Sequence, residues 1–142
     1  MSSMSKRDDL HWPARRALEK EGWTITQDPL VIVFRGVRLK ADLGAERRFV
    51  AEKEGRKIAV EVKDFDGPAA TSELEKAMGQ LQLYGWALEE NDPTRELWLA
   101  VSETAYRQHF TRPLFCTVIE RNHIDLIIFD AQQEVVTQWL KQ

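Results

Sequence analysis

The sequence predicts a mixed α/β domain in which helices cover both faces of a central mixed sheet. Two observations support this fold class. The first is the order of hydrophobic periodicities: one helical segment, four strand-like runs, a helix, a strand, a helical region and two strands. The second is size, because 142 residues with 43% hydrophobic content can bury one core without disulfides. We therefore expect a single domain over residues 1–142.

The first half of the chain predicts one helix and two hairpins. Apolar residues recur at helical spacing over 9–21, and Gly22 follows as a helix-ending residue. Strand-like runs at 30–34 and 37–43 flank Arg35-Gly36, which predicts a hairpin. The runs 49–53 and 57–63 flank residues 54–56 and predict a second hairpin.

The second half predicts a long helix followed by alternating strands and helices. Residues 64–68 break the strand, and Ser72 with Glu75 forms a capping-box pattern for a helix that ends near Glu90. The continuous apolar run 97–101 is typical of a strand covered on both faces. Helical segments at 104–109 and 113–121 follow, and strands at 124–129 and 135–140 close the chain.

Several function classes are excluded or disfavoured by composition. Cys116 is the single cysteine, so no disulfide forms within the chain, and its apolar surroundings favour a buried, inert thiol. No apolar run approaches the ~20 residues of a membrane span, and the first nine residues lack the apolar core of a signal peptide. We therefore expect a cytoplasmic protein. Residues His11, His109 and His123 show no metal-ligand spacing.

Positive charge is concentrated in the middle of the sequence. Residues 35–63 hold nine Lys or Arg against five Asp or Glu, whereas the whole chain carries a net charge of −3. A solvated hairpin face explains this pattern, and so does a surface that binds phosphate. The basic residues expected on a nucleic-acid-binding surface are Arg35, Arg38, Lys40, Arg47, Arg48, Arg56 and Lys57.

Two carboxylates and a lysine form the candidate catalytic site. Strand alternation over 57–63 places Glu61 and Lys63 on the same face, opposite the apolar residues. Asp42 ends the strand-like run 37–43, so it meets Glu61 if these two strands pair. Carboxylates close to one another suit Mg²⁺ or Mn²⁺. On the following helix, Gln80 and Tyr84 are four residues apart and share a face that can address the same site.

These residues carry a resemblance to a known superfamily. Asp42, Glu61-Val62-Lys63 and Gln80-x-x-x-Tyr84 resemble the active-site pattern of the PD-(D/E)XK nucleases, particularly the RecB-like and Holliday-resolvase-like branches. The resemblance implies a restriction-endonuclease-like α/β/α sandwich. Segments 21–29, 42–46, 51–63 and 135–140 resemble the cyanobacterial XisH family more closely, over nearly the whole chain. That family is described as controlling excision of the fdxN element and is associated with a companion called XisI.

The resemblance also implies roles for individual residues. Asp42, Glu61 and the Val62 carbonyl would be metal ligands, and Lys63 would hold the attacking water or the scissile phosphate. The chain departs from the pattern in two places. No acidic residue of the first helix is clearly placed as a further ligand, and Ala41 stands where the motif has a proline.

Three functions remain open at this stage. The leading one is Mg²⁺- or Mn²⁺-dependent endonuclease activity that assists site-specific excision of a DNA element, alongside an XisI-like companion and, indirectly, a site-specific recombinase. The second is a non-catalytic accessory of the same fold that binds DNA or a partner protein. The third is a toxin-like or defence module paired with its companion. A homo-oligomer is compatible with each.

Overall fold

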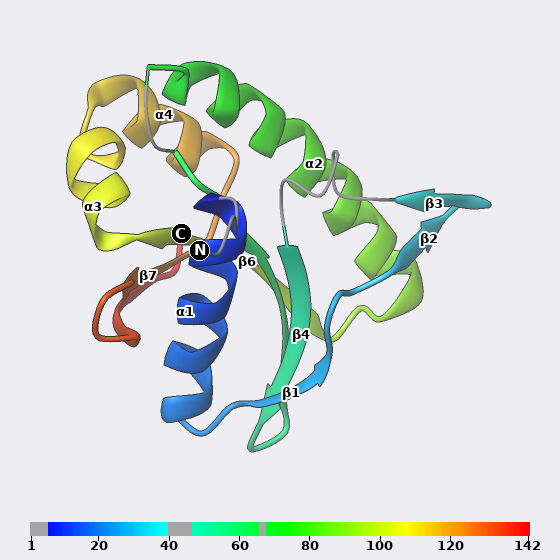
Figure 1. Cartoon of the computed structure of the whole chain (residues 1–142). Helices are drawn as coiled ribbons and strands as arrows, with labels where there is room; N and C mark the ends of the chain where they lie inside the picture. Colours follow the sequence, from blue (N-terminus) through cyan, green and yellow to red (C-terminus); the bar gives the residue numbers. More distant parts are fainter. Residues whose placement is uncertain (1–5, 40–46, 66–67) are drawn as a thin grey trace.

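A six-stranded sheet forms the centre of the computed structural model, which describes residues 6–39, 47–65 and 68–142 (Figure 1). Its strand order is β1-β4-β5-β6-β7-β8. The strands are β1 (Thr24–Gln27), β4 (Arg47–Lys53), β5 (Arg56–Val62), β6 (Arg95–Ser102), β7 (Leu126–Asp130) and β8 (Val135–Leu140).

The sheet is mixed, as the sequence predicts. Strands β5, β6 and β7 run parallel, whereas β1–β4, β4–β5 and β7–β8 are antiparallel pairs. The parallel strands are joined through helices, so their carboxyl ends meet at one edge of the sheet. In open α/β sheets this edge is where ligands bind.

Helices cover both faces of the sheet, which confirms the predicted layers. On one face α1 (Lys6–Lys20) packs against β4, β5, β6 and β7, through Ala14, Ala17 and Leu18. On the other face lie α2 (Ala70–Asn91), α3 (Glu103–Ala105), a π-helical turn η2 (Tyr106–Phe110) and α4 (Pro113–Arg121). No helix in the described part of the chain is long and apolar enough to cross a membrane.

The hairpin of β2 (Ile32–Phe34) and β3 (Val37–Leu39) stands apart from the main sheet and lies beside α2 (Figure 1). The expected pairing of strands 37–43 and 57–63 is therefore wrong for the described residues. The predicted hairpin of 49–53 and 57–63 is confirmed, because β4 pairs with β5 and aligns Phe49 and Ala51 with Val60 and Ile58. Ile32 packs into the core with Ala59, which fixes the hairpin against α2.

Other local expectations are also corrected. Strand β1 was not predicted, and α2 begins at Ala70 without a side-chain cap, so Ser72 and Glu75 form no capping box. Cys116 is exposed rather than buried, because α4 turns Phe115 and Ile119 inward and Cys116 outward. Its Sγ atom lies 3.3 Å from the Phe110 carbonyl oxygen.

Candidate functional site

Glu61 and Lys63 lie on the α2 face of the sheet, at the carboxyl end of β5. Ile58, Val60 and Val62 pack into the core under α1, whereas Ala59 packs with α2. Strand alternation therefore directs Glu61 and Lys63 toward α2. The backbone N–H of Lys63 donates to the Ala100 carbonyl at 3.2 Å, so the ladder continues past Val62.

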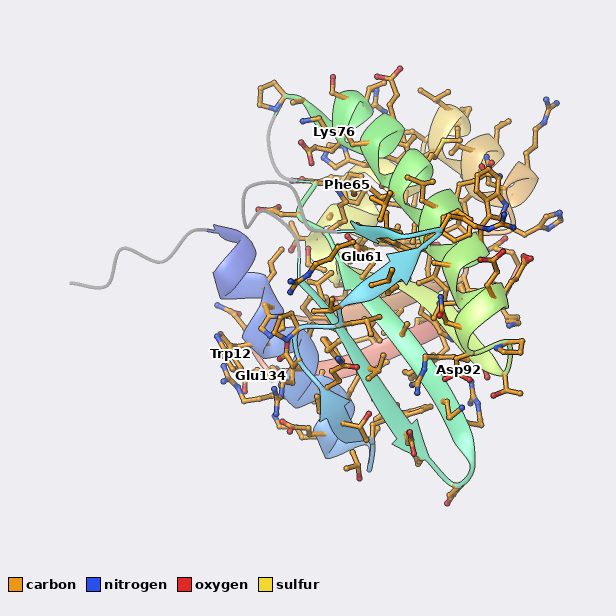
Figure 2. All side chains as sticks on the ribbon, turned by 90° about the vertical axis from the view of Figure 1, so that its right-hand side faces the viewer. Trp12, Glu61, Phe65, Lys76, Asp92 and Glu134 are labelled. Carbon is orange, nitrogen blue, oxygen red and sulfur yellow. The ribbon has the colours of Figure 1, made fainter. Side chains whose placement is uncertain are left out.

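Both side chains are buried, with exposed fractions of 0% for Glu61 and 1% for Lys63. Figure 2 shows Glu61 toward the same end of the sheet as Phe65, away from Asp92. Moving an isolated ion out of water costs several kcal/mol. The attraction between the opposite charges of Glu61 and Lys63 offsets part of that cost. A buried carboxylate and a buried lysine side by side are unfavourable for packing alone, and such groups concentrate at functional sites.

Helix α2 contributes Gln80 and Tyr84 to the same side of the sheet. Tyr84 is 2% exposed and packs in a cluster with Ala59, two residues before Glu61. Gln80 lies one turn earlier on α2, and its Oε1 atom is buried with no hydrogen-bond partner among the described residues. An unsatisfied buried acceptor of this kind is unfavourable, and its satisfaction by a water or an ion bound at the site would remove the cost.

Asp42 and Lys40 lie outside the described residues. The chain position of Asp42 still limits its distance from the site, because β4 begins at Arg47, which is the Cα partner of Val62. Four residues separate Asp42 from Arg47, so their Cα atoms are at most about 18 Å apart along an extended chain. The side chain of Val62 packs in the α1 core, so only its backbone carbonyl is available as a ligand.

The residues present fit a hard divalent cation in part. Glu61 supplies a carboxylate and Val62 a carbonyl, and Gln80 adds an amide oxygen; oxygen ligands are those that Mg²⁺ prefers. Within residues 6–39, 47–65 and 68–142, no three His, Cys, Asp or Glu side chains group as a metal site. Asp42, the second carboxylate that the sequence predicts, lies outside these ranges.

The predicted basic residues do not form one patch. Arg47 and Arg48 are the Cα partners of Val62 and Glu61, which places their backbone beside the site. Arg56 and Lys57 lie at the opposite end of β5, roughly 16 Å along the strand. Arg38 is exposed on β3, and Arg35 is exposed at the hairpin tip. The prediction of a single surface around Glu61 is wrong for Arg56 and Lys57.

Several of these cations are engaged in ion pairs. Arg35 donates to Glu90 of α2 at 2.6 Å, and Arg56 donates to Glu96 at 2.9 Å. Lys57 donates to Asp92 at 2.7 Å. The hydrogen bond from Lys57 holds the pKa of Asp92 below its usual range, and that from Arg56 does the same for the pKa of Glu96. These three basic residues therefore stabilise surface contacts between elements.

A buried polar cluster on the α1 face was not predicted as a unit. His11 is 1% exposed, and its Nε2 atom lies 2.8 Å from Oδ2 of Asp28. The same oxygen accepts a hydrogen bond from Arg15 at 2.8 Å. Helical spacing could have predicted the burial of His11. It lies three residues before Ala14 and seven before Leu18, on the same buried face of α1. The cluster ties α1 to the segment that follows β1.

Comparison with known proteins identifies the family. The family described as "XisH protein" matches residues 4–137. The chain belongs to the XisH family. Among curated proteins none matches. An XisH family protein from Nostoc punctiforme is 41% identical, with a TM-score of 0.86, over 94% of this chain and 100% of that chain.

A second solved structure supports the same membership. The fdxN element excision controlling factor protein from Anabaena variabilis is 40% identical, with a TM-score of 0.87. The match covers 95% of this chain and 100% of that one. The XisH resemblance predicted from the sequence is confirmed, and the mixed sheet with helices on both faces is the architecture of this XisH family chain.

Proposed function

We propose that this XisH family chain is a restriction-endonuclease-like domain of the PD-(D/E)XK type that cleaves DNA phosphodiesters with Mg²⁺ or Mn²⁺. The observation that carries the proposal is the pair Glu61 and Lys63, buried together on the α2 face at the carboxyl end of β5. Packing alone does not favour two ionisable groups there, whereas phosphoryl transfer needs a carboxylate and a cation in one dry site.

The chain's own residues divide the chemistry as follows. Glu61, Asp42 and the Val62 carbonyl would hold the cation, which would lower the pKa of a water and offset phosphate charge. Lys63 would donate hydrogen bonds to the water or to a phosphate oxygen and stabilise the negative charge that develops. Gln80 and Tyr84 would orient the same phosphate or water from α2, since the Gln80 oxygen has no hydrogen-bond partner among the described residues.

The proposed biological setting comes from the relatives. Because the 40% identical protein from Anabaena variabilis is named an fdxN element excision controlling factor, we propose that this chain acts in the excision of a DNA element. Its partners would be DNA, an XisI-like companion and, indirectly, a site-specific recombinase. The backbone of Arg47 and Arg48 lies beside Val62 and Glu61, and we propose these two residues as phosphate contacts.

The test is a cleavage assay on a panel of DNA forms. Duplex, single-stranded, nicked, flapped and branched substrates are incubated with the chain in Mg²⁺, in Mn²⁺ and in EDTA. We expect metal-dependent nicking or cutting of at least one form and no cleavage in EDTA. The Glu61→Gln variant should leave all forms intact.

A non-catalytic accessory is the second candidate, favoured by one surface observation. Leu83 and Trp86 are 40% and 47% exposed and lie three residues apart on α2, and neighbouring exposed apolar side chains of this kind are found at protein interfaces. An accessory of this kind would bind its partner with unchanged affinity when Glu61 and Lys63 are replaced. A cleavage-deficient chain that still supports excision would favour this function.

A further inference from the structure

The outer face of α2 carries a row of exposed residues at regular helical spacing. Lys76, Gly79, Leu83, Trp86 and Glu90 follow one another at intervals of three, four, three and four residues. This spacing keeps all five on one side of a helix, as in the contact seam of paired helices. We call this row the α2 seam. The exposed side-chain fractions of Lys76 and Glu90 are 58% and 41%.

The α2 seam contains a large side chain and a matching gap. Trp86 is 47% exposed, and Gly79 lies two turns earlier. A Cβ atom added to Gly79 or to Gly85 would meet nothing within 4 Å in the described part of the chain. A glycine inside a helix is unfavourable relative to alanine, so packing within the chain does not explain either one. Close approach of a second helix explains Gly79, which lies on the α2 seam.

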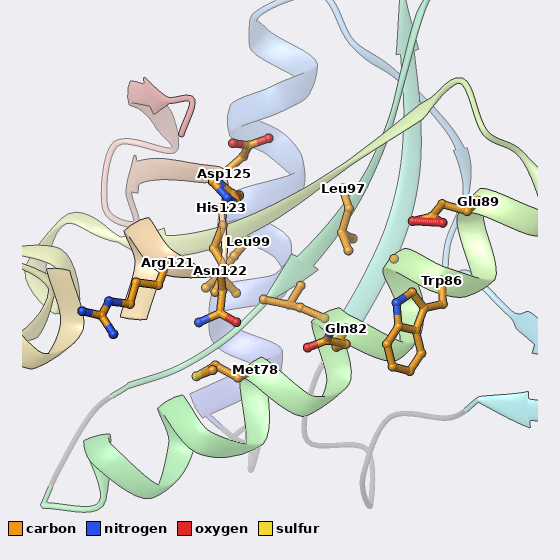
Figure 3. A pocket seen from close by; sticks show the side chains of 13 residues that line it. Met78, Gln82, Trp86, Glu89, Leu97, Leu99, Arg121, Asn122, His123 and Asp125 are labelled. Atoms are coloured by element: carbon orange, nitrogen blue, oxygen red, sulfur yellow. The ribbon is translucent and has the colours of Figure 1, made fainter. Parts of the chain in front are cut away.

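A hollow of about 390 Å³ adjoins the α2 seam. Gln82, Gly85 and Trp86 line one side, and Asn122 and His123 after α4 line the other, with Leu97 and Leu99 at the base (Figure 3). Its apolar base and polar rim are the features of a surface that receives an aromatic side chain. The hollow therefore lies on the flank of α2 beside Trp86, next to the α2 seam.

We propose that the α2 seam pairs two copies of this chain. The seam is complementary to itself when two α2 helices lie antiparallel about a two-fold axis beside Leu83. In that arrangement Trp86 of one copy lies over Gly79 of the other, and each Leu83 contacts its counterpart. Self-complementarity of this kind is what a two-fold interface requires, since each contact occurs twice.

Charge complementarity favours the same occupant. Two members of the α2 seam carry opposite charges: Lys76 at the amino-terminal end, which lies 3.9 Å from Glu73 of the same helix, and Glu90 at the carboxyl-terminal end. Antiparallel pairing brings each Lys76 to the partner's Glu90, whereas a parallel pair would place like charges together. Glu90 already accepts from Arg35 at 2.6 Å, so the contact extends an existing ion pair between α2 and the hairpin.

The experiment measures the mass of the full chain by sedimentation velocity over a concentration series. We expect a monomer–dimer equilibrium that Trp86→Ala weakens about 30-fold or more, as for the removal of a central aromatic contact. Gly79→Gln should also weaken the dimer while leaving or raising the melting temperature, because it improves helix propensity but fills the gap. Trp12→Ala is the matched control, since Trp12 is 42% exposed on the opposite side of the sheet.

Two further variants test the axis and the direction of pairing. Leu83→Cys in a Cys116→Ser background should form a disulfide-linked dimer on mild oxidation, because the two-fold axis brings the thiols together. Lys76→Glu should weaken the dimer, and Lys76→Glu with Glu90→Lys should restore it. A monomer at every concentration, or a dimer that Trp86→Ala and Gly79→Gln leave unchanged, overturns the proposal. Neither result bears on DNA cleavage, because Glu61 and Lys63 face the inner side of α2.

Discussion

Lys63 and Glu61 are buried together on one face of the sheet, two residues apart along the chain. The exposed fraction is 1% for Lys63 and 0% for Glu61. The pair stands at the carboxyl end of a strand whose other face is occupied by Val60 and Val62 under α1. An aliphatic pair would fill this space at lower cost, because burying a carboxylate and an ammonium requires compensation for lost hydration. We attribute the burial of Glu61 and Lys63 to the phosphodiester cleavage proposed above.

Metal binding should stabilise the folded chain. A cation that binds only the folded state at one hundred times its Kd adds about 2.7 kcal/mol to the free energy of unfolding. For a domain of this size each kcal/mol corresponds to roughly 3–5 °C, so saturating Mn²⁺ should raise the melting temperature by several degrees. Differential scanning calorimetry of the wild type and Glu61→Gln checks this, and an equal rise in both would place the cation elsewhere.

Gln80 should show opposite effects on stability and activity. Replacing it with methionine removes a buried acceptor that has no partner among the described residues. We expect Gln80→Met to raise the free energy of unfolding by about 1 kcal/mol and to slow cleavage. Urea denaturation and a cleavage assay measure the two effects. A loss of stability would mean that the Gln80 oxygen already has a partner in the protein.

Acid should weaken the contact between Lys57 and Asp92. The Lys57 hydrogen bond lowers the pKa of Asp92 from its ordinary value of 3.8 in the unfolded chain. The stabilisation is therefore fully present above about that pH and is lost as the pH falls through the lower, folded-state pKa. Both side chains are about a third exposed, so the contribution is at most ~1 kcal/mol. Unfolding free energies below pH 4 should fall less steeply for Lys57→Met than for wild type.

DNA affinity should depend more on Arg38 than on Arg56, which is engaged in an ion pair. Arg38 is exposed on β3, whereas Arg56 is engaged by Glu96 at the far end of β5. We expect Arg38→Ala to reduce the slope of log affinity against log salt by about one phosphate contact, or ~0.9 for duplex DNA, and Arg56→Ala to leave it unchanged. Fluorescence anisotropy at several salt concentrations measures both slopes. An equal reduction of the slope in Arg38→Ala and Arg56→Ala would instead support the single basic surface expected from the sequence.

Hydrophobic periodicity predicted the position of single strands and the face of the sheet on which their side chains lie. The edge strand β8 was predicted with the bounds Val135–Leu140, and alternation placed Glu61 and Lys63 on one face correctly. Both hairpins, β2–β3 and β4–β5, were predicted from their turn residues. The further expectation that β3 lies beside β5 was wrong, because Ile32 packs with Ala59 against α2 and holds the β2–β3 hairpin outside the main sheet. Strand β1 is only four residues long and largely exposed, so it gave no pattern.

The site was predicted as far as local geometry reaches. Gln80 and Tyr84 share a helix face, and Tyr84 contacts the same cluster as Ala59 of β5. The position of Asp42 depends on how the chain returns from the hairpin to β4, which no local pattern specifies. The exposure of Trp86 could not be predicted from the sequence, because an indole in an amphipathic helix is usually part of the core.

The most direct test of the proposed chemistry is single-turnover cleavage in Mn²⁺ of the DNA form that the wild type cuts best. Lys63→Met should abolish cleavage while retaining the metal-induced rise in melting temperature, since Lys63 acts on the phosphate or water and is not a ligand. Lys57→Met, the same substitution at the other end of β5, should cleave at the wild-type rate. Cleavage by Lys63→Met and Glu61→Gln at the wild-type rate, or no cleavage of any DNA form by the wild type, would contradict a nuclease site at Glu61 and Lys63.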